Sequence, residues 1–257
     1  MSAYNHVMSR LAVCIHGMWG TSDVWRPWRD HLESRGWQTR APALRHHEAP
    51  PLAPPPALGA TSLRDYVADL EVELRALPEK PVLIGHSMGG LIALLLAARG
   101  LASRAVLLTP APPASVFALR LSNVVAFSRI QMNWGWWRKP HRATEREALR
   151  DTFNTMPADE ACALHRAFVH ESGRALFEIG LPWLDSGKAA AIDPAAISVP
   201  LLFVAATQDR LTPASVVRRT ADLFSNSTYR EYPAQGHWVL GQPGWQTIAE
   251  DTVTWLS

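Results

Sequence analysis

The chain has 257 residues, 47% of them hydrophobic, and its 25 lysines and arginines nearly balance its 23 aspartates and glutamates. This balance excludes the basic surface that nucleic-acid binding requires. No stretch approaches the ~20 apolar residues of a membrane-spanning helix, and residues 1–10 are too polar for a secretory leader, so we expect a cytoplasmic protein without integral membrane association.

Short apolar segments alternate with helical patterns over the first 110 residues, which is typical of a parallel sheet covered by helices. Four strands and three helices are predicted, the strands at 11–16, 37–42, 81–85 and 105–109 and the helices at 24–35, 62–76 and 91–99. Five prolines fall within residues 43–60. Because proline lacks an amide hydrogen, this stretch is predicted to be an irregular surface connection.

The alternation stops between residues 111 and 198, where helical patterns at 144–153 and 158–170 occur without a buried strand. It then returns with elements of both kinds, namely a strand at 199–206, a helix from Ala214, a strand at 228–232 and a helix from Trp245. The sequence therefore predicts one α/β core formed by residues 1–110 and 199–257. A helical insertion at 111–198 interrupts it.

Residues 85–89 (GHSMG) match the pattern Gly-x-Ser-x-Gly between a predicted strand and a predicted helix. A sharp turn there holds the serine in strained geometry, and the flanking glycines avoid collisions. The Ser87 hydroxyl would then lie at the helix N-terminus, where the Met88 amide faces developing negative charge. We predict that Ser87 is a nucleophile; the alternative is a serine that only caps the helix.

A serine hydroxyl reacts well only beside a base that takes its proton. His237 follows the last predicted strand, at the sheet edge that carries Ser87, and is the predicted base. His16 is assigned to the loop after the first strand and His86 to the inside of the turn. The pair at residues 46–47 is read as loop polarity, because no further cluster of metal ligands accompanies it and no metal is expected.

The imidazole needs an acceptor that fixes its tautomer. Asp209 lies just past the strand at 199–206, at the edge where catalytic groups of open α/β sheets gather. We predict Asp209 as this acid, with a turn or cap near Pro213 as its alternative role. Asp185 and Asp193 are the alternative acids.

Gly17 follows the first predicted strand and would let the Met18 amide reach the site opposite Met88. Two such donors would form an oxyanion hole, in which losing one typically costs ~3 kcal/mol of barrier. A plain tight turn is the alternative. Trp19 and Trp238 are candidates for substrate binding in an apolar pocket, and packing between insertion and core is the alternative for tryptophans here.

The order of these motifs resembles the α/β-hydrolase superfamily: HGMWG at 16–20, GHSMG at 85–89, QDRLTP at 208–213 and GHW at 236–238. The resemblance implies an α/β-hydrolase fold with a mostly parallel sheet of roughly six strands, flanked by helices. It also implies that the insertion is a helical cap, or lid. The expected activity is that of a carboxylesterase or lipase-like serine hydrolase, which needs no cofactor and acts on a small, apolar ester.

The triad does not select the electrophile, so thioesters, amides and carbon–carbon bonds stay open as alternative substrates. Ser87 argues against the members of the superfamily that use an aspartate nucleophile. A non-catalytic receptor for a small ligand, built on the same fold, is a further alternative. Every catalytic position is filled in this sequence, which favours the enzyme.

Overall fold

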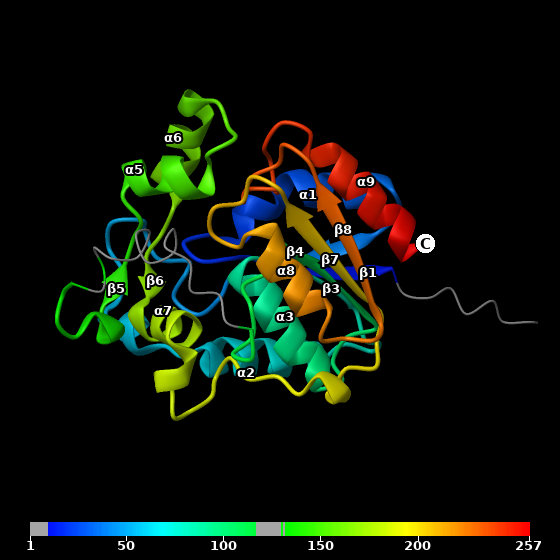
Figure 1. The fold of residues 1–257 in the computed structure, drawn as a ribbon, viewed down its shortest axis with the longest axis horizontal. Helices are drawn as coiled ribbons and strands as arrows, with labels where there is room; N and C mark the ends of the chain where they lie inside the picture. The colour runs from blue at the N-terminus through cyan, green and yellow to red at the C-terminus, as the bar shows by residue number, and fades with distance from the viewer. Residues whose placement is uncertain (1–9, 117–129, 131) are drawn as a thin grey trace, which may run out of the picture.

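The computed structural model describes residues 10–116, 130 and 132–257, and the predicted core and insertion extend into residues outside these ranges. Six strands form one sheet in the order β2-β1-β3-β4-β7-β8, with every neighbouring pair parallel. They are β1 Leu11–Ile15, β2 Gln38–Arg40, β3 Val82–His86, β4 Arg104–Leu108, β7 Leu201–Ala206 and β8 Ser227–Tyr232. This confirms the predicted parallel sheet flanked by helices (Figure 1).

Helices cover both faces of the sheet. On one face lie α2 (Leu63–Arg75), α3 (Met88–Ala98) and α8 (Ala214–Ala221), and on the other α1 (Arg26–Ser34) and α9 (Trp245–Leu256). Successive residues of a strand point to opposite faces, so Val13 and Ile15 join the first hydrophobic cluster while Ala12 and Cys14 join the second. Because both faces are covered, β1, β3 and β7 are buried along their whole length.

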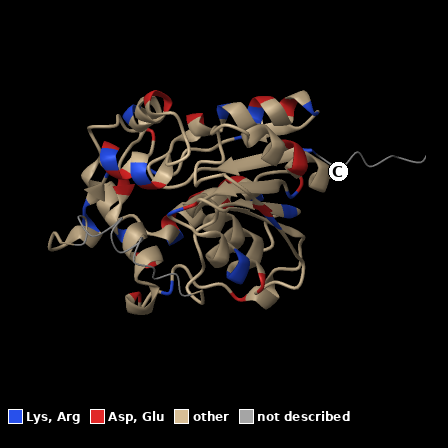
Figure 2. Cartoon of the chain, turned by 45° about the horizontal axis from the view of Figure 1, so that its top comes forward, with Lys and Arg blue, Asp and Glu red and all other residues tan. Residues whose placement is uncertain are grey.

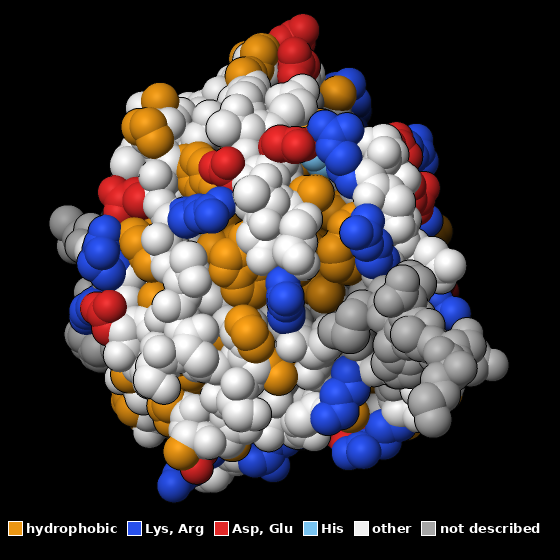
Figure 3. Space-filling view, turned by 90° about the vertical axis from the view of Figure 1, so that its right-hand side faces the viewer, with side chains coloured by type: hydrophobic (Ala, Val, Ile, Leu, Met, Phe, Trp, Pro, Cys, Tyr) orange, Lys and Arg blue, Asp and Glu red, His pale blue; other side chains and the backbone are white. Residues whose placement is uncertain are grey.

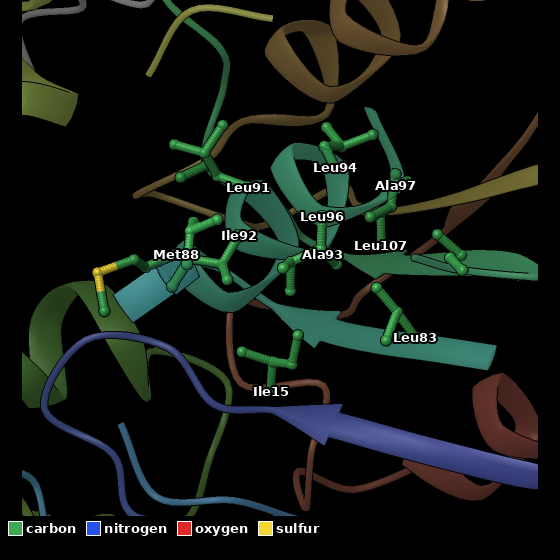
Figure 4. Packing of buried hydrophobic residues seen from close by; sticks show 14 of the residues in the cluster. Ile15, Leu83, Met88, Leu91, Ile92, Ala93, Leu94, Leu96, Ala97 and Leu107 are labelled. Atoms are coloured by element: carbon green, nitrogen blue, oxygen red, sulfur yellow. The ribbon is translucent and has the colours of Figure 1, made fainter. Parts of the chain in front are cut away.

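The helix α3 lies in the centre of this core. Its sequence, MGGLIALLLAA, is apolar on every side, and nine of its eleven residues are buried, as expected for a helix surrounded by protein. Figure 4 shows its side chains packed together with Ile15, Leu83 and Leu107 of the sheet. Burying each leucine-sized side chain contributes ~1.5–3 kcal/mol. The helix begins directly after Ser87, so this packing also fixes the position of that residue.

Between β4 and β7, the described part of residues 111–198 forms short helices and one small antiparallel pair of strands (Figure 1). In chain order the described elements are η3 (Trp136–Arg138), β5 (Pro140–His141), α5 (Glu145–Glu147), η4 (Ala148–Thr152), α6 (Ala158–Ala167), β6 (Glu171–Ser172), α7 (Gly173–Gly180), η5 (Pro182–Leu184) and η6 (Pro194–Ala196). The helix predicted to reach residue 170 ends at Ala167, because the backbone turns extended at Phe168. The short helices η1 (Ser22–Trp25) and η2 (Pro56–Ala60) lie outside this segment.

Charged groups of both signs are dispersed over the molecule, as Figure 2 shows on the helices and loops. On the face at the right-hand side of Figure 1, basic and acidic side chains alternate with hydrophobic ones (Figure 3). Within the described ranges, no helix combines the length and apolar character needed to cross a membrane.

Candidate active site

Ser87 occupies the turn between β3 and α3 with a φ of 55° and a ψ of −120°. Such a conformation costs a non-glycine residue on the order of 1–3 kcal/mol, so the surrounding structure must hold it. The Ser87 amide donates to the Leu108 carbonyl at 3.0 Å, and its carbonyl accepts from the Ala111 amide at 2.9 Å. The backbone is thus held from both sides, while the residue itself stays partly exposed.

Two glycines let neighbouring backbone approach Ser87. A Cβ atom on Gly89 would lie 2.1 Å from the carbonyl oxygen of Ile15, and one on Gly17 would lie 2.9 Å from the Cβ of Ser87. Carbon atoms pack at about 3.5–4.0 Å, so neither position has room for a side chain. The loop after β1 therefore lies directly against the start of α3, beside Ser87.

We expect Gly89→Ala to destabilise the protein, because the added methyl group would collide with backbone of β1 that cannot move aside. Overpacking of a core typically costs ~1–3 kcal/mol, and more where backbone must shift. Thermal unfolding should be compared with Gly180→Ala, a position where a Cβ meets no atom within 4 Å. A strongly lowered Tm or loss of folded protein for Gly89→Ala alone is expected; equal Tm values would contradict the close approach.

His237 and Asp209 form a buried pair in which Nδ1 lies 2.8 Å from Oδ2. The carboxylate also accepts from the amides of Leu211 and Thr212, each at 2.8 Å, and from the Thr212 hydroxyl at 2.7 Å. Burial acts to raise the pKa of Asp209, but the His237 ring and these hydrogen bonds outweigh it and hold the pKa below its ordinary value. Asp209 is therefore anionic at neutral pH and keeps a proton on Nδ1 of His237.

Two core residues hold the backbone of His237. His86 donates from Nε2 to the His237 carbonyl at 3.0 Å, and the Thr109 hydroxyl donates to the same oxygen at 3.2 Å. Burial, reinforced by the neighbouring His237, lowers the pKa of His86 to about 3, so this ring is neutral. The His86 ring lies 5.0 Å from the His237 ring. Since His86 also directly precedes Ser87 in the chain, it connects Ser87 with His237.

Within the described residues, the hydrogen bonds of the His237 ring all run through Nδ1. Its Nε2 is left as an acceptor, because the proton that Asp209 binds sits on the other nitrogen. Hydrogen bonds between a nucleophile and its base are often long without substrate and tighten when one binds. Among the described residues, no hydrogen bond joins the Ser87 hydroxyl to His237 in the absence of a substrate.

The amides of Met18 and Met88 flank this turn. Met88 is the first residue of α3, and Met18 belongs to the peptide after Gly17. The Gly17 carbonyl accepts from the Gly20 amide at 3.2 Å and from Nδ1 of His16 at 2.9 Å. Carbonyl and N–H point in opposite directions in a trans peptide, so the Met18 N–H points away from His16. Among the described residues, neither methionine amide donates to a backbone carbonyl, which suits donors to an oxyanion.

Trp19 and Trp238 lie in an aromatic cluster with Phe153 and Phe168. The Trp238 ring is 5.0 Å from Phe153 and 5.8 Å from Phe168, and Trp19 stacks on Phe168 at 6.3 Å. Both phenylalanines belong to the 111–198 segment, so the cluster joins that segment to the sheet. A small pocket beside it is lined by Trp19 and Leu211 together with residues of that segment, namely Ile130, Ala143, Glu147, Asp151 and Thr152.

The sequence model of the alpha/beta hydrolase family matches residues 12–246. The chain belongs to this family. The structure of the methylesterase MES16 from Arabidopsis superposes with a TM-score of 0.72 at 14% identity, covering 96% of this chain and 98% of that one. A monoacylglycerol lipase from Paleococcus ferrophilus gives 0.69 at 20% identity, covering 96% and 93%. A pyrethroid hydrolase from Sphingobium faniae gives 0.69 at 16%, covering 95% and 96%. At identities this low, the superpositions establish a shared fold and nothing more.

In this α/β hydrolase the alternative acids have other partners. Asp185 accepts from the Arg174 guanidinium at 2.9 Å and from the Ala189 amide at 2.7 Å. Asp193 accepts from the Ala195 amide at 3.0 Å and so caps a short helix. Both carboxylates serve the local structure of the 111–198 segment, whereas Asp209 is hydrogen-bonded to a histidine.

The structure of this α/β hydrolase corrects the interpretation of residues 46–47 as loop polarity for His47, whereas His46 is partly exposed. His47 is completely buried, and its Nε2 lies 3.0 Å from Oε2 of Glu171, which is equally buried. The sequence analysis also gave no role to Thr212. This residue lies within the quoted motif at 208–213, and its hydroxyl and amide both donate to Asp209. The His47–Glu171 pair has no sequence signal, since 124 residues separate its members.

Proposed function

We propose that this α/β hydrolase cleaves carboxylic esters through an acyl-enzyme intermediate formed on Ser87. The observation that carries the proposal is the buried His237–Asp209 pair at 2.8 Å. It is linked to Ser87, a serine held at positive φ, by the preceding residue His86, which donates to the His237 carbonyl. Asp209 keeps the proton on Nδ1, so Nε2 of His237 can accept the proton of the Ser87 hydroxyl. A hydroxyl beside such a base becomes a competent nucleophile.

In the first half of the proposed reaction, Oγ of Ser87 attacks the ester carbonyl carbon while its proton passes to His237. The carbonyl oxygen becomes an oxyanion held by the amides of Met18 and Met88, each of which contributes ~3 kcal/mol to stabilising the transition state. His237 then returns the proton to the departing alkoxide, which leaves as the alcohol. The acyl group stays on Ser87, and the Asp209 carboxylate stabilises the transient imidazolium.

In the second half, a water molecule takes the place of the alcohol. His237 removes its proton as the oxygen attacks the acyl carbon, and the same two amides stabilise the second oxyanion. Collapse of this intermediate releases the carboxylic acid and returns the proton to Ser87. Every group that the cycle requires belongs to this chain.

For the substrate, we propose an apolar ester that contacts Trp19, with residues 111–198 as a cap over a core formed by residues 1–110 and 199–257. The pocket supports this assignment, since Trp19 and Leu211 line it from the core side and the 111–198 segment lines the rest. The methylesterase and the lipase among the similar structures are named for esters, which favours esters over other carbonyl compounds. Trp238 stays a prediction as a substrate contact, because it does not line this pocket.

The test combines initial rates on p-nitrophenyl esters, from acetate to palmitate, with mass spectrometry of protein quenched during turnover. We expect release of p-nitrophenol and an acyl adduct on the peptide that contains Ser87. The chain-length profile then measures the size of the acyl group that the site accepts. Hydrolysis without any adduct on Ser87 would contradict the mechanism, and cleavage of thioesters but of no ester would replace the proposed substrate class.

A further inference from the structure

A group of buried polar side chains connects the 111–198 segment with the Gly17–Met18 peptide. It starts at Glu171 on β6, where Oε2 lies 3.0 Å from Nε2 of His47. The other carboxylate oxygen accepts from the Tyr66 hydroxyl and from the Ser172 amide, both at 2.7 Å. Glu171, His47 and Tyr66 are all completely buried. The carboxylate therefore has partners on both of its oxygens.

His47 is the cationic member of this group. Its Nδ1 faces the Arg45 carbonyl at 3.1 Å, and its Nε2 faces Glu171, so both nitrogens act as donors. Burial acts to lower the pKa of His47, but the Glu171 carboxylate outweighs it and the pKa is raised above its ordinary value. Removing one partner of a buried ion pair leaves an uncompensated charge, which the remaining structure must rearrange to accommodate.

From His47 the connection continues to His16. The His47 amide donates to the Leu44 carbonyl at 2.9 Å, which closes a turn, and the Leu44 amide donates to Nε2 of His16 at 3.1 Å. The two histidine rings lie 5.0 Å apart. Since Nε2 accepts a hydrogen bond, the proton of neutral His16 sits on Nδ1, which donates to the Gly17 carbonyl. Burial, followed by the charge of His47, lowers the pKa of His16 to about 3 and keeps this form.

We propose that Glu171 is a positioning residue for the oxyanion hole. Through His47 and His16 it fixes the carbonyl of Gly17, and with it the N–H of Met18 on the other side of the same peptide. Glu171 itself belongs to the 111–198 segment, so the packing of that segment on the sheet determines the direction of the Met18 N–H. The catalytic consequence rests on the proposed function, whereas the effect on the Met18 amide does not.

A second buried carboxylate provides a matched control. Glu178 also belongs to the 111–198 segment and is 1% exposed. It accepts from the Ser62 hydroxyl and the Leu63 amide, each at 2.8 Å, at the start of α2, and from Arg174 at 2.7 Å. It therefore ties the same segment to the core, but its partners lie at the start of α2 and in α7, and it has no hydrogen bond to His47 or His16. Loss of a buried carboxylate is common to both variants, but only Glu171 contacts His47.

The first measurement compares Glu171→Gln and Glu178→Gln in the full chain by the amide signal of Met18. Selective ¹⁵N-methionine labelling leaves few signals, because the chain has six methionines, and Met18→Leu identifies the relevant one. We expect Glu171→Gln to shift this signal and Glu178→Gln to leave it in place. An unchanged signal in Glu171→Gln would overturn the proposal, whatever the protein catalyses.

The second measurement uses ester hydrolysis and a trifluoromethyl ketone, whose hemiketal with Ser87 carries an oxyanion. Misdirecting one donor of an oxyanion hole should lower kcat by about 10–100-fold, with KM nearly unchanged and the ketone bound correspondingly more weakly. Glu178→Gln should change neither, although both variants lose stability. Equal losses of kcat in the two variants would reduce Glu171 to a structural role and overturn the proposal.

Tyr66→Phe tests the proposal if Glu171→Gln does not fold. It removes one donor to the carboxylate and leaves the His47–Glu171 pair in place, so we expect a smaller shift of the Met18 signal in the same direction. The absence of any shift in folded Tyr66→Phe would overturn the proposal. A wild-type protein that hydrolyses no ester would contradict the proposed function alone, since the Met18 signal is read without substrate.

Discussion

Replacing Ser87 by alanine is expected to lower kcat for ester hydrolysis by about 10⁵–10⁶-fold, the loss typical of removing a serine nucleophile. The variant keeps the two backbone donors and the pocket, so a small residual rate over water is expected. Because Ser87 lies at positive φ, alanine adopts the turn with the same strain, and the folded structure should persist. The measurement is the initial rate on the best p-nitrophenyl ester, normalised to folded protein.

The matched control is Ser34→Ala, which removes a hydroxyl from the exposed end of α1 and should leave kcat unchanged. Wild type, Ser34→Ala and Ser87→Ala should be purified in parallel, so that a contaminating esterase contributes equally to all three. Activity of Ser87→Ala above about one thousandth of wild type, beyond that background, would contradict the assignment of the nucleophile.

The second large effect is expected for Asp209→Asn, which should lower kcat about 10⁴-fold with little change in KM. An asparagine amide can present an N–H where the carboxylate accepted, and His237 would then carry its proton on Nε2. That nitrogen could no longer accept the proton of Ser87. Steady-state kinetics on the same ester, with circular dichroism as a check of folding, measures this loss.

Asp193→Asn is the natural comparison, because Asp193 is an alternative acid by sequence and its carboxylate caps an exposed turn. We expect this variant to hydrolyse the ester at nearly the wild-type rate. The reverse ranking, with the larger loss in Asp193→Asn, would assign the acid to residue 193 and leave Asp209 as a helix cap.

The core of this α/β hydrolase could be predicted from sequence because local chemistry determines it. Strands that are covered on both faces must be apolar throughout, so segments such as LAVCI and LLFVAA indicate β1 and β7 directly. The glycines around Ser87 similarly mark a turn in which backbone approaches backbone. The Ser62 cap of α2 also follows from local chemistry, and its hydroxyl accepts from the Arg64 amide at 3.1 Å.

The features that the sequence did not predict depend on contacts between distant residues. The pair β5–β6 has two residues in each strand, which is too short for an alternating pattern. His47 lies in a proline-rich connection and Glu171 in the middle of the 111–198 segment, so each looks like a surface residue until the fold joins them. Thr212 was within a recognised motif, but its contact with Asp209 becomes visible only when both side chains are placed.

The hydrogen bond from the Ala111 amide to the Ser87 carbonyl has a practical consequence for protein engineering. The chain leaves the sheet after β4, and its first residue beyond Pro110, Ala111, is hydrogen-bonded to the turn that holds Ser87. The rest of the 111–198 segment follows. In a chimera that exchanges this segment with that of another family member, the junction should come after Ala111. The inserted segment can then vary in length and composition, while the recipient protein keeps the hydrogen bond from the Ala111 amide to the Ser87 carbonyl.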